Sequence, residues 1–301
     1  MEQSAVPASP PAVPAPRDVL ELLKPITWFP PMWAFACGVV SSGIAPGGRW
    51  PFLLAGIALT GPLVCGTSQA INDWYDRHVD AINEPHRPIP SGRIAGTWGL
   101  RIALAGSLLS LLVAALVGPW VLAATVLGLA CAWVYSAPPF RLKASGWTGP
   151  LVVALSYEGL TWFTGASVMA GALPRGEILA VLLLYSLGAH GIMTLNDFKA
   201  VAGDSRTGLR SLPVTLGVRR AALLACATMA LAQAAVVALL LAWAMPLPAA
   251  LVAGLLAGQV ALMPRLVREP AVNAPWYAAR GVTLYVAGML AAALGLGGYI
   301  G

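Results

Sequence analysis

Long apolar runs are the feature that most restricts how this chain can fold. Nine of them recur along the sequence, separated by turn signals such as Pro46-Gly47-Gly48 and Gly118-Pro119. About twenty apolar residues in a helix cross the hydrocarbon core of a bilayer, where only helices and closed barrels satisfy their own backbone hydrogen bonds. The expected spans are residues 26–45, 52–72, 97–117, 119–137, 148–169, 177–197, 219–243, 247–264 and 277–299.

The composition favours the same class. Of 301 residues, 58% are hydrophobic and only 10% are charged, whereas a soluble globular domain carries about 25% charged residues. The sequence therefore predicts an all-α polytopic membrane protein with nine transmembrane helices. Residues 1–17 are rich in Pro and Ala and are expected to form a disordered tail, without the basic segment of a cleaved signal peptide. Residues 18–301 are expected to form the transmembrane domain.

Basic residues are distributed unevenly between the two sets of loops that nine spans create. The N-terminus and the connections after spans 2, 4, 6 and 8 hold 16 of the 18 Lys and Arg residues, and the other loops hold only Arg49 and Arg175. The positive-inside rule places the richer set in the cytoplasm. The net charge of +6 thus reflects topology, and no nucleic-acid partner is expected.

Polar side chains gather at the end of the second span. Asn72, Asp73, Asp76 and Asp80 fall within nine residues. At about 100° per residue, the three aspartates lie within roughly 60° of one another on a helix. Carboxylates on one face repel each other unless a cation lies among them, and hard oxygen ligands suit Mg²⁺. These four residues are therefore candidate magnesium ligands.

A second polar cluster follows the sixth span. It begins with Asn196 and Asp197, and Asp204 shares a face with Asp197 if the helix continues. Both clusters open with Asn-Asp at the end of an apolar run, 124 residues apart (196 − 72). This pattern predicts a second set of metal ligands. It also predicts two related halves facing one another, spans 1–4 and 5–8, with span 9 closing the bundle.

Basic residues share the cytoplasmic loops with these acids. A topogenic role would explain most of them one by one, but carboxylate-bound Mg²⁺ beside Arg and Lys is what a diphosphate requires, because the cations neutralise its charge. At the mouth of an apolar bundle, a polyprenyl diphosphate is the expected substrate. Lys199 is expected to stabilise charge on the leaving diphosphate. The candidate bases are Arg77, Arg87, Arg141, Lys143, Lys199, Arg206 and Arg210.

These motifs resemble the UbiA superfamily of intramembrane prenyltransferases and, within it, the chlorophyll and bacteriochlorophyll synthase family. The resemblance covers about residues 18–300, and the stretch 186–195 is more similar to the bacteriochlorophyll branch. In one departure, the third acid that many superfamily members carry in the second motif is Ala200 here. Besides the pattern NDxxDxxxD at 72–80, the matching segments are Arg87-Pro-Ile-Pro-Ser-Gly92, Tyr135-Ser-Ala-Pro-Pro-Phe-Arg-Leu-Lys143, Asn196-Asp-Phe-Lys199 and Gly208-Leu-Arg-Ser-Leu-Pro213.

The resemblance implies Mg²⁺-dependent transfer of a geranylgeranyl or phytyl group from its diphosphate to bacteriochlorophyllide, which is esterified on its propionate. A propionate is ionised at neutral pH, so it attacks as a carboxylate and needs no general base. The expected setting is the lipid of a bacterial inner, photosynthetic intracytoplasmic membrane, with the active site facing the cytoplasm. Association with other pigment-synthesis or assembly proteins is left open, as is the choice of tail.

Two residues inside the expected spans have more than one interpretation. His190 lies about two turns before Asp197 and is either a hydrogen-bonded packing residue or a contact to the chlorin macrocycle or its magnesium. Glu158 lies in the middle of the fifth span, where an acid is a functional candidate by default. Pairing within the bundle is its other interpretation.

Three alternatives remain at this point. A UbiA-type enzyme could use chlorophyllide, an aromatic quinone precursor or haem as its acceptor. A transporter or divalent-ion carrier would also have related halves, although its acids are expected near the middle of the membrane rather than at one face. A pigment-holding assembly factor would work without the acids.

Overall fold

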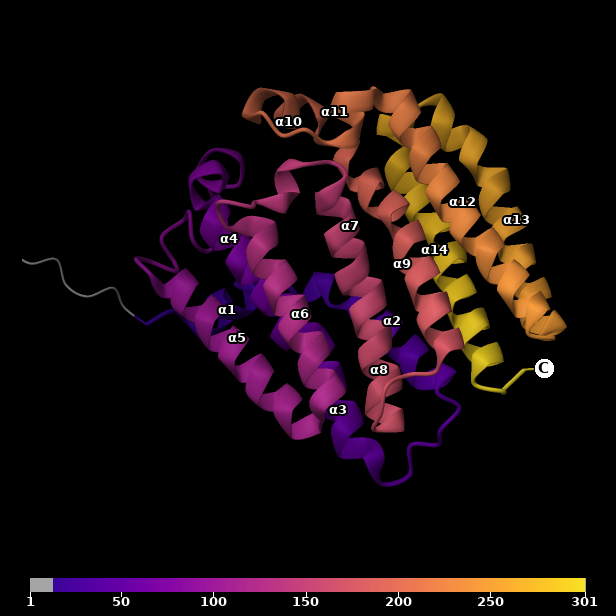
Figure 1. The fold of residues 1–301 in the computed structure, drawn as a ribbon. Helices are drawn as coiled ribbons and strands as arrows, with labels where there is room; N and C mark the ends of the chain where they lie inside the picture. Colours follow the sequence, from indigo (N-terminus) through magenta and orange to yellow (C-terminus); the bar gives the residue numbers. More distant parts are fainter. Residues whose placement is uncertain (1–12, 301) are drawn as a thin grey trace, which may run out of the picture.

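The structure, a computed structural model, describes residues 13–300 without the side chains of Ala202, Arg206 and Thr207. The long helices stand side by side in one bundle, with α10 and α11 across its upper end (Figure 1). The elements are α1 (Pro16–Leu22), η1 (Pro25–Thr27), α2 (Phe29–Ser41), η2 (Gly47–Arg49), α3 (Trp50–Ala58), η3 (Leu59–Leu63), α4 (Val64–Asn83), α5 (Trp98–Val117), α6 (Pro119–Ser136), η4 (Leu142–Ala144), α7 (Thr148–Ala154), η5 (Leu155–Leu160), α8 (Thr161–Ala170), α9 (Gly176–Asp197), α10 (Val201–Thr207), α11 (Leu212–Leu216), α12 (Val218–Ala242), α13 (Pro246–Arg268) and α14 (Pro270–Leu296).

The predicted all-α membrane class is confirmed. Seven helical segments of the described chain are long and apolar enough to cross a membrane. The other two expected spans correspond to α2, which has only 13 residues, and to the rod α7–η5–α8, which a π-helical turn interrupts. The count of nine spans therefore stays a prediction. The eighth expected span, residues 247–264, is longer than the sequence indicates, because α13 continues through Pro264 to Arg268.

The N-terminal segment is only partly described. Residues 1–12 of the expected tail lie outside the described residues. Helix α1 begins at Pro16, before the expected boundary at residue 18, because proline suits the first turn of a helix. Arg93 holds α1 against the loop after α4, with its guanidinium nitrogens 2.6 Å from both Asp18 and Glu21.

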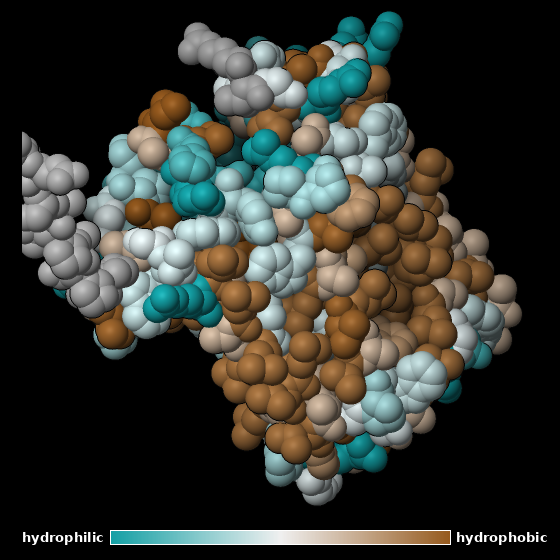
Figure 2. Space-filling view, turned by 60° about the vertical axis from the view of Figure 1, so that its left-hand side comes forward, coloured by the Kyte–Doolittle hydropathy of each residue, from teal (hydrophilic) through white to brown (hydrophobic). Residues whose placement is uncertain are grey.

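Helix α5 shows how the outer surface suits a membrane. Leu104, Leu108, Leu112 and Leu116 recur every four residues and are 52%, 59%, 55% and 82% exposed. A stripe of exposed leucines on one helix face is unfavourable in water and favourable in hydrocarbon. Figure 2 shows a broad hydrophobic surface along the side of the bundle, with hydrophilic residues gathered toward its upper end.

The two halves meet where α2 crosses α8. A Cβ added at Gly38 would lie 2.0 Å from the carbonyl oxygen of Trp162, and one added at Gly165 would lie 2.1 Å from that of Phe35. Small residues at such a crossing let two backbones approach closely. Trp162 Nε1 donates to the Ser41 hydroxyl at 3.0 Å across the same seam. The crossing fixes the first helix of one half against the first helix of the other.

Three connections, residues 84–97, 137–147 and 198–217, form what we call the polar end of the bundle. Backbone hydrogen bonds join the second connection to the third. The Gly146 N–H donates to the Arg210 carbonyl at 2.9 Å, and the Arg210 N–H donates to the Ala144 carbonyl at 3.1 Å. The connection that carries Arg141 and Lys143 is thereby tied to the connection that follows the second acidic cluster.

Helix α9 ends at Asp197, and a turn over residues 198–200 leads into α10. The helix does not continue, so the condition under which Asp197 and Asp204 would share one helical face is not met. The Ala200 N–H donates to the Asp197 carbonyl at 3.0 Å, which closes the turn. Phe198 is only 2% exposed and packs into the core of the bundle. Burying this ring stabilises the turn more than a further turn of helix, which would place the ring elsewhere.

Candidate active site

One cavity of about 1030 Å³ lies beneath the polar end, between helices of both halves. Its apolar wall includes Leu59 and Val64 from the first half and Val153 and Leu160 from the second. Residues of both acidic clusters therefore meet in this one cavity, although they are far apart in sequence. The charged and amide side chains that line it are Gln69, Asn72, Asp76, Arg141, Lys143, Asn196, Asp197, Lys199 and Asp204.

Helix α4 divides the first cluster between two environments. Asn72 and Asp76 are one turn apart and line the cavity. Asp73 and Asp80 do not line it, and they are 1% and 7% exposed. The three aspartates do lie on roughly one side of α4, as predicted. That side is wide, however, and only Asp76 reaches the cavity. Asn72 is oriented by its amide nitrogen, which donates to the Ser136 hydroxyl at 3.4 Å.

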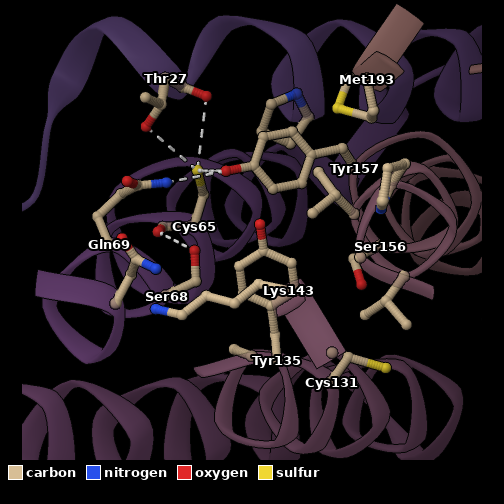
Figure 3. Close-up of a pocket in the computed structure, with 18 of the residues that line it drawn as sticks. Thr27, Cys65, Ser68, Gln69, Cys131, Tyr135, Lys143, Ser156, Tyr157 and Met193 are labelled. Carbon is tan, nitrogen blue, oxygen red and sulfur yellow. Dashed lines mark hydrogen bonds between the residues drawn. The ribbon is translucent and has the colours of Figure 1, made fainter. Parts of the chain in front are cut away.

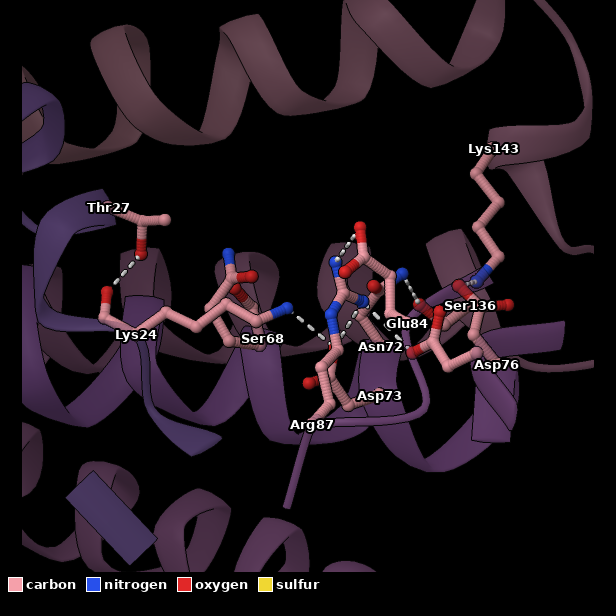
Figure 4. A network of polar contacts seen from close by, with 12 residues as sticks. Lys24, Thr27, Ser68, Asn72, Asp73, Asp76, Glu84, Arg87, Ser136 and Lys143 are labelled. Carbon is pink, nitrogen blue, oxygen red and sulfur yellow. Dashed lines mark hydrogen bonds and ion pairs between the residues drawn. The ribbon is translucent and has the colours of Figure 1, made fainter. Parts of the chain in front are cut away.

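Asp73 and Asp80 belong to a network of ion pairs beside the cavity. Figure 4 shows Asp73 with Lys24 and Arg87. Lys24 Nζ donates to Asp73 Oδ1 at 2.6 Å. Arg87 lies between the two acids, 3.7 Å from Asp73 and 2.9 Å from Asp80. The second oxygen of Asp73 is buried and has no hydrogen-bond partner among the described residues. In this arrangement Lys24 and Arg87 reduce the repulsion between the two carboxylates.

Asp76 is paired with two bases from the connection after α6. Lys143 Nζ donates to it at 2.6 Å, and Arg141 lies 3.5 Å away. Burial lowers the pKa of Lys143 below its usual value, while the hydrogen bond with Asp76 opposes that change. The two cations are thus available at the polar wall of the cavity, where an anion with more charge than one carboxylate would bind strongly.

Two of these bases have unusual backbone conformations. Lys24 and Arg141 have φ values of +48° and +40°, in the left-handed region that residues other than glycine rarely adopt. Such a conformation costs about 1–3 kcal/mol and is concentrated at functional sites. Both side chains reach an aspartate of the first cluster. The strain supports a functional role for these two positions.

The second cluster contributes from the end of α9 and the segment after it. Asn196, Asp197, Lys199 and Asp204 all line the cavity. Among the described residues, Asp197 has no ion-pair partner, in contrast to the acids of the first cluster. Lys199 lies in the turn between α9 and α10, and this turn brings the residue to the cavity wall.

Several predicted residues lie elsewhere. Arg77 stacks on Trp74, 4.3 Å from the ring centroid, and Arg210 is exposed in the backbone pairing with residues 144 and 146. His190 is 7% exposed beside Trp147, 6.1 Å between ring centroids, and does not line the cavity. The side chain of Arg206 lies outside the described residues. Glu158 is also buried away from the cavity, and its Oε2 has no partner among the described residues.

The structure adds residues that the motifs did not single out. Lys24 is one of the 16 basic residues that indicate topology, and its position just before the first expected span is visible in the sequence. Tyr157 and Gln69 line the cavity and are hydrogen bonded to one another at 3.1 Å. Gln69 lies one turn before Asn72 on α4, and this spacing was the signal that could have found it.

The donor atoms of the cavity suit a divalent cation bound together with a phosphate. No group of three His, Cys, Asp or Glu side chains is assembled as a metal site in the part of the chain that the structure describes. Asn72 and Asp76 from α4, with Asn196 and Asp197 from α9, nevertheless supply carboxylate and amide oxygens to one cavity. Mg²⁺ commonly uses one or two carboxylates and takes its other ligands from water and substrate phosphates. This donor set fits that chemistry.

Comparisons with known proteins agree with the geometry. The UbiA prenyltransferase family matches residues 27–286. The chain is 58% identical over 289 residues to the bacteriochlorophyll synthase 33 kDa chain of Cereibacter sphaeroides, covering 96% of both, and 54% identical over 291 residues to that of Rhodobacter capsulatus, again covering 96% of both. A UbiA homolog from Archaeoglobus fulgidus bound to GPP and Mg²⁺ has the same fold, with a TM-score of 0.70 and 21% identity over 91% of this chain and 99% of that chain. This chain therefore belongs to the UbiA prenyltransferase family, as the motifs at the ends of its second and sixth expected spans predict.

Proposed function

We propose that this prenyltransferase is a bacteriochlorophyll synthase, which transfers a geranylgeranyl or phytyl group from its diphosphate to the propionate of bacteriochlorophyllide. The observation that carries the proposal is the single cavity in which both Asn-Asp motifs, three bases and a long apolar wall meet. The similarity to the bacteriochlorophyll synthases over nearly the whole chain supports the choice of acceptor.

The polar wall is suited to hold a metal diphosphate. Asn72, Asp76, Asn196, Asp197 and Asp204 are the residues that would hold Mg²⁺. When bound, the metal supplies charge stabilisation for the diphosphate oxygens. Arg141, Lys143 and Lys199 are the cations available to the remaining phosphate charge. Together these groups stabilise the negative charge that builds on the leaving diphosphate.

The apolar wall suits the other half of the reaction. Breaking the allylic C1–O bond leaves its electron pair on the diphosphate and a cation on the prenyl chain. Side chains such as Leu59, Val153 and Leu160 exclude water that would otherwise capture this cation. A carboxylate oxygen of the acceptor then forms the ester bond to C1, and no proton has to be removed.

The direct test is incubation of the purified protein with bacteriochlorophyllide and geranylgeranyl or phytyl diphosphate, with and without Mg²⁺. We expect the prenyl ester of bacteriochlorophyllide to form only with the metal, and chromatography with mass spectrometry identifies it. Prenylation of an aromatic quinone precursor or of haem in place of the chlorin would contradict the proposed acceptor. An unchanged pigment bound without any ester would indicate a pigment-holding protein instead.

The proposed setting is a bacterial inner, photosynthetic intracytoplasmic membrane, with the polar end in the cytoplasm. The uneven distribution of 16 and 2 basic residues among the loops supports this orientation. We expect single cysteines introduced near Ser91 and Gly208, in a background without the native cysteines, to react from the cytoplasmic side. Labelling of either position by a membrane-impermeant reagent added to intact cells would contradict the orientation.

Lys199 offers a test of the diphosphate site. Lys199→Met should remove one charge-assisted contact, worth about 1.5–3 kcal/mol, and slow single turnover roughly ten- to a hundredfold. The Mg²⁺ requirement should change little, because the ammonium is not a metal ligand. Lys199→Arg should restore only part of the rate, since the geometry of its donors differs. Complete rescue by Arg would instead indicate a residue that only sets topology.

A further inference from the structure

A group of neutral polar side chains lies deeper in the cavity than the metal ligands. Cys65, Ser68 and Gln69 come from α4, Tyr135 from α6 and Tyr157 from the π-helical turn η5. Figure 3 shows the Tyr157 hydroxyl directed at Cys65 and Gln69, and the Tyr135 hydroxyl pointing toward the same group. An apolar prenyl tail has no use for this group, and no metal or diphosphate role accounts for it.

The hydrogen bonds within this group leave two phenolic protons for a ligand. Ser68 donates its proton to the Cys65 carbonyl at 2.7 Å, and the Thr27 hydroxyl donates to the Lys24 carbonyl at 2.8 Å. The Tyr157 oxygen accepts from Gln69 Nε2 at 3.1 Å. It also lies 3.3 Å from Cys65 Sγ, whose single proton is shared between Tyr157 and the Thr27 carbonyl oxygen, 3.5 Å away.

Gln69 Nε2 is an unambiguous donor to the Tyr157 oxygen, and sulfur is only a weak acceptor. Tyr157 can therefore donate its own proton to a stronger acceptor in the cavity. Tyr135 lines the same cavity and has no hydrogen-bond partner among the described residues. Two O–H donors are therefore free for an acceptor atom in the cavity.

The position of the group along α4 relates it to the reaction. Gln69 lies about 5 Å along the helix axis from Asn72 and about 10 Å from Asp76, at 1.5 Å per residue. A diphosphate on the metal ligands would place C1 of the prenyl chain between those ligands and the tyrosines. A nucleophile that attacks C1 from the side opposite the leaving group would then approach from the Tyr157 side.

We propose that Tyr157, held by Gln69 and assisted by Tyr135, binds the propionate carboxylate of the acceptor and directs it at C1; this subsite rests on the proposed function. The C1–O bond breaks and its electron pair leaves with the diphosphate, and the carboxylate oxygen then forms the new bond to C1 of the prenyl cation.

Neutral donors suit this task. Lys24 is paired with Asp73 outside the cavity lining, and Lys143 lies beside Asp76 at the diphosphate end of the cavity. Hydrogen bonds from neutral hydroxyls reduce the nucleophilicity of a carboxylate less than an ion pair with Lys or Arg, because charge-assisted hydrogen bonds are stronger.

The test compares Tyr157→Phe with Tyr277→Phe. The first removes one hydroxyl from the cavity, and the second removes a buried hydroxyl of α14 that does not line it. We expect Tyr157→Phe to lower kcat/KM for bacteriochlorophyllide about ten- to a hundredfold. Its affinity for the prenyl diphosphate in the presence of Mg²⁺ should stay unchanged. Tyr277→Phe should behave as the wild type.

A second measurement asks whether the hydroxyl recognises the carboxylate itself. The wild-type protein should bind bacteriochlorophyllide more tightly than its propionate methyl ester, measured by quenching of chlorin fluorescence. Tyr157→Phe should remove that difference, and Gln69→Leu should reduce it, because it frees Tyr157 from its orienting donor. If Tyr157→Phe folds poorly, Gln69→Leu with the same pair of ligands decides the question.

Three results would overturn the subsite. Unchanged preference for the acid in both variants would show that other groups bind the carboxylate. A loss of prenyl diphosphate affinity or of cation formation, with acceptor binding intact, would assign the hydroxyl to the tail or the cation. If the wild-type protein makes the ester and the variants make it at the same rate, only this inference is wrong. If the wild-type protein makes no chlorin ester, the proposed function is wrong.

Discussion

Asp76→Asn is expected to slow ester formation on the order of a hundred- to a thousandfold, the range seen when one electrostatic contact to a developing charge is removed. Asp76 is the only carboxylate of the first cluster that lines the cavity in the described structure, and it contacts Lys143 at 2.6 Å. Asparagine keeps the shape of the side chain but loses the charge that attracts a divalent cation. Single-turnover rates over a range of Mg²⁺ concentrations should show a lower maximum rate and a higher metal requirement.

A matched acid-to-amide change provides the control. Glu177 lies in the first turn of α9, at the opposite end of that helix from Asp197, and Glu177→Gln should leave the rate and the metal requirement unchanged. A wild-type rate in Asp76→Asn at every Mg²⁺ concentration would remove Asp76 from the metal ligands.

Asp73→Asn is expected to act mainly on stability, and this separates it from Asp76. Asp73 is 1% exposed, and its carboxylate is paired with Lys24 at 2.6 Å and lies 3.7 Å from Arg87. Removing one partner of a buried pair costs 3–5 kcal/mol, and because the Lys24 side chain is 23% exposed we expect about 2–3 kcal/mol here. Unfolding of the protein in one detergent, followed by circular dichroism, measures the loss.

A double-mutant cycle isolates the pair. Lys24→Met combined with Asp73→Asn should cost less than the sum of the single changes. Each single change leaves the other charge of the pair without its partner, whereas the double change removes both charges. Glu21→Gln, in an exposed pair with Arg93, should change stability by less than about 1 kcal/mol. Additive losses in the cycle would mean that Lys24 does not stabilise Asp73.

The helices were largely predictable because each apolar run is long and the turn signals between runs are strong. α5 and α6 begin and end within a few residues of the expected spans. The end of α9 was not predictable, because the pattern of carboxylates seven residues apart is equally consistent with a continued helix. The burial of Phe198 decides the matter, and burial depends on neighbours that the local sequence does not contain.

The candidate site was predictable in its residue types more than in its geometry. Spacing on a helix placed three aspartates within an arc of roughly 60°. An arc of that width includes both residues that line the cavity and residues that lie beside it. Which side each carboxylate takes depends on Lys24 and Arg87, which approach from other segments. Tyr157 and Gln69 meet across 88 residues of sequence, and no motif records such a meeting.

The glycine crossing of α2 and α8 has a consequence for engineering and for natural variation. At Gly38 and Gly165 the backbones themselves are in contact, so the smallest possible enlargement acts as a wedge between the halves. A larger side chain at this crossing would tilt α2 relative to α8, and the displacement of their backbones would grow with distance from the crossing. The proposed metal ligands Asp76 and Asp197 lie toward the polar end on α4 and α9, where the spacing that a cation tolerates is narrow. Methyl groups at this seam would therefore change the metal preference and reaction rate of a site that they never touch.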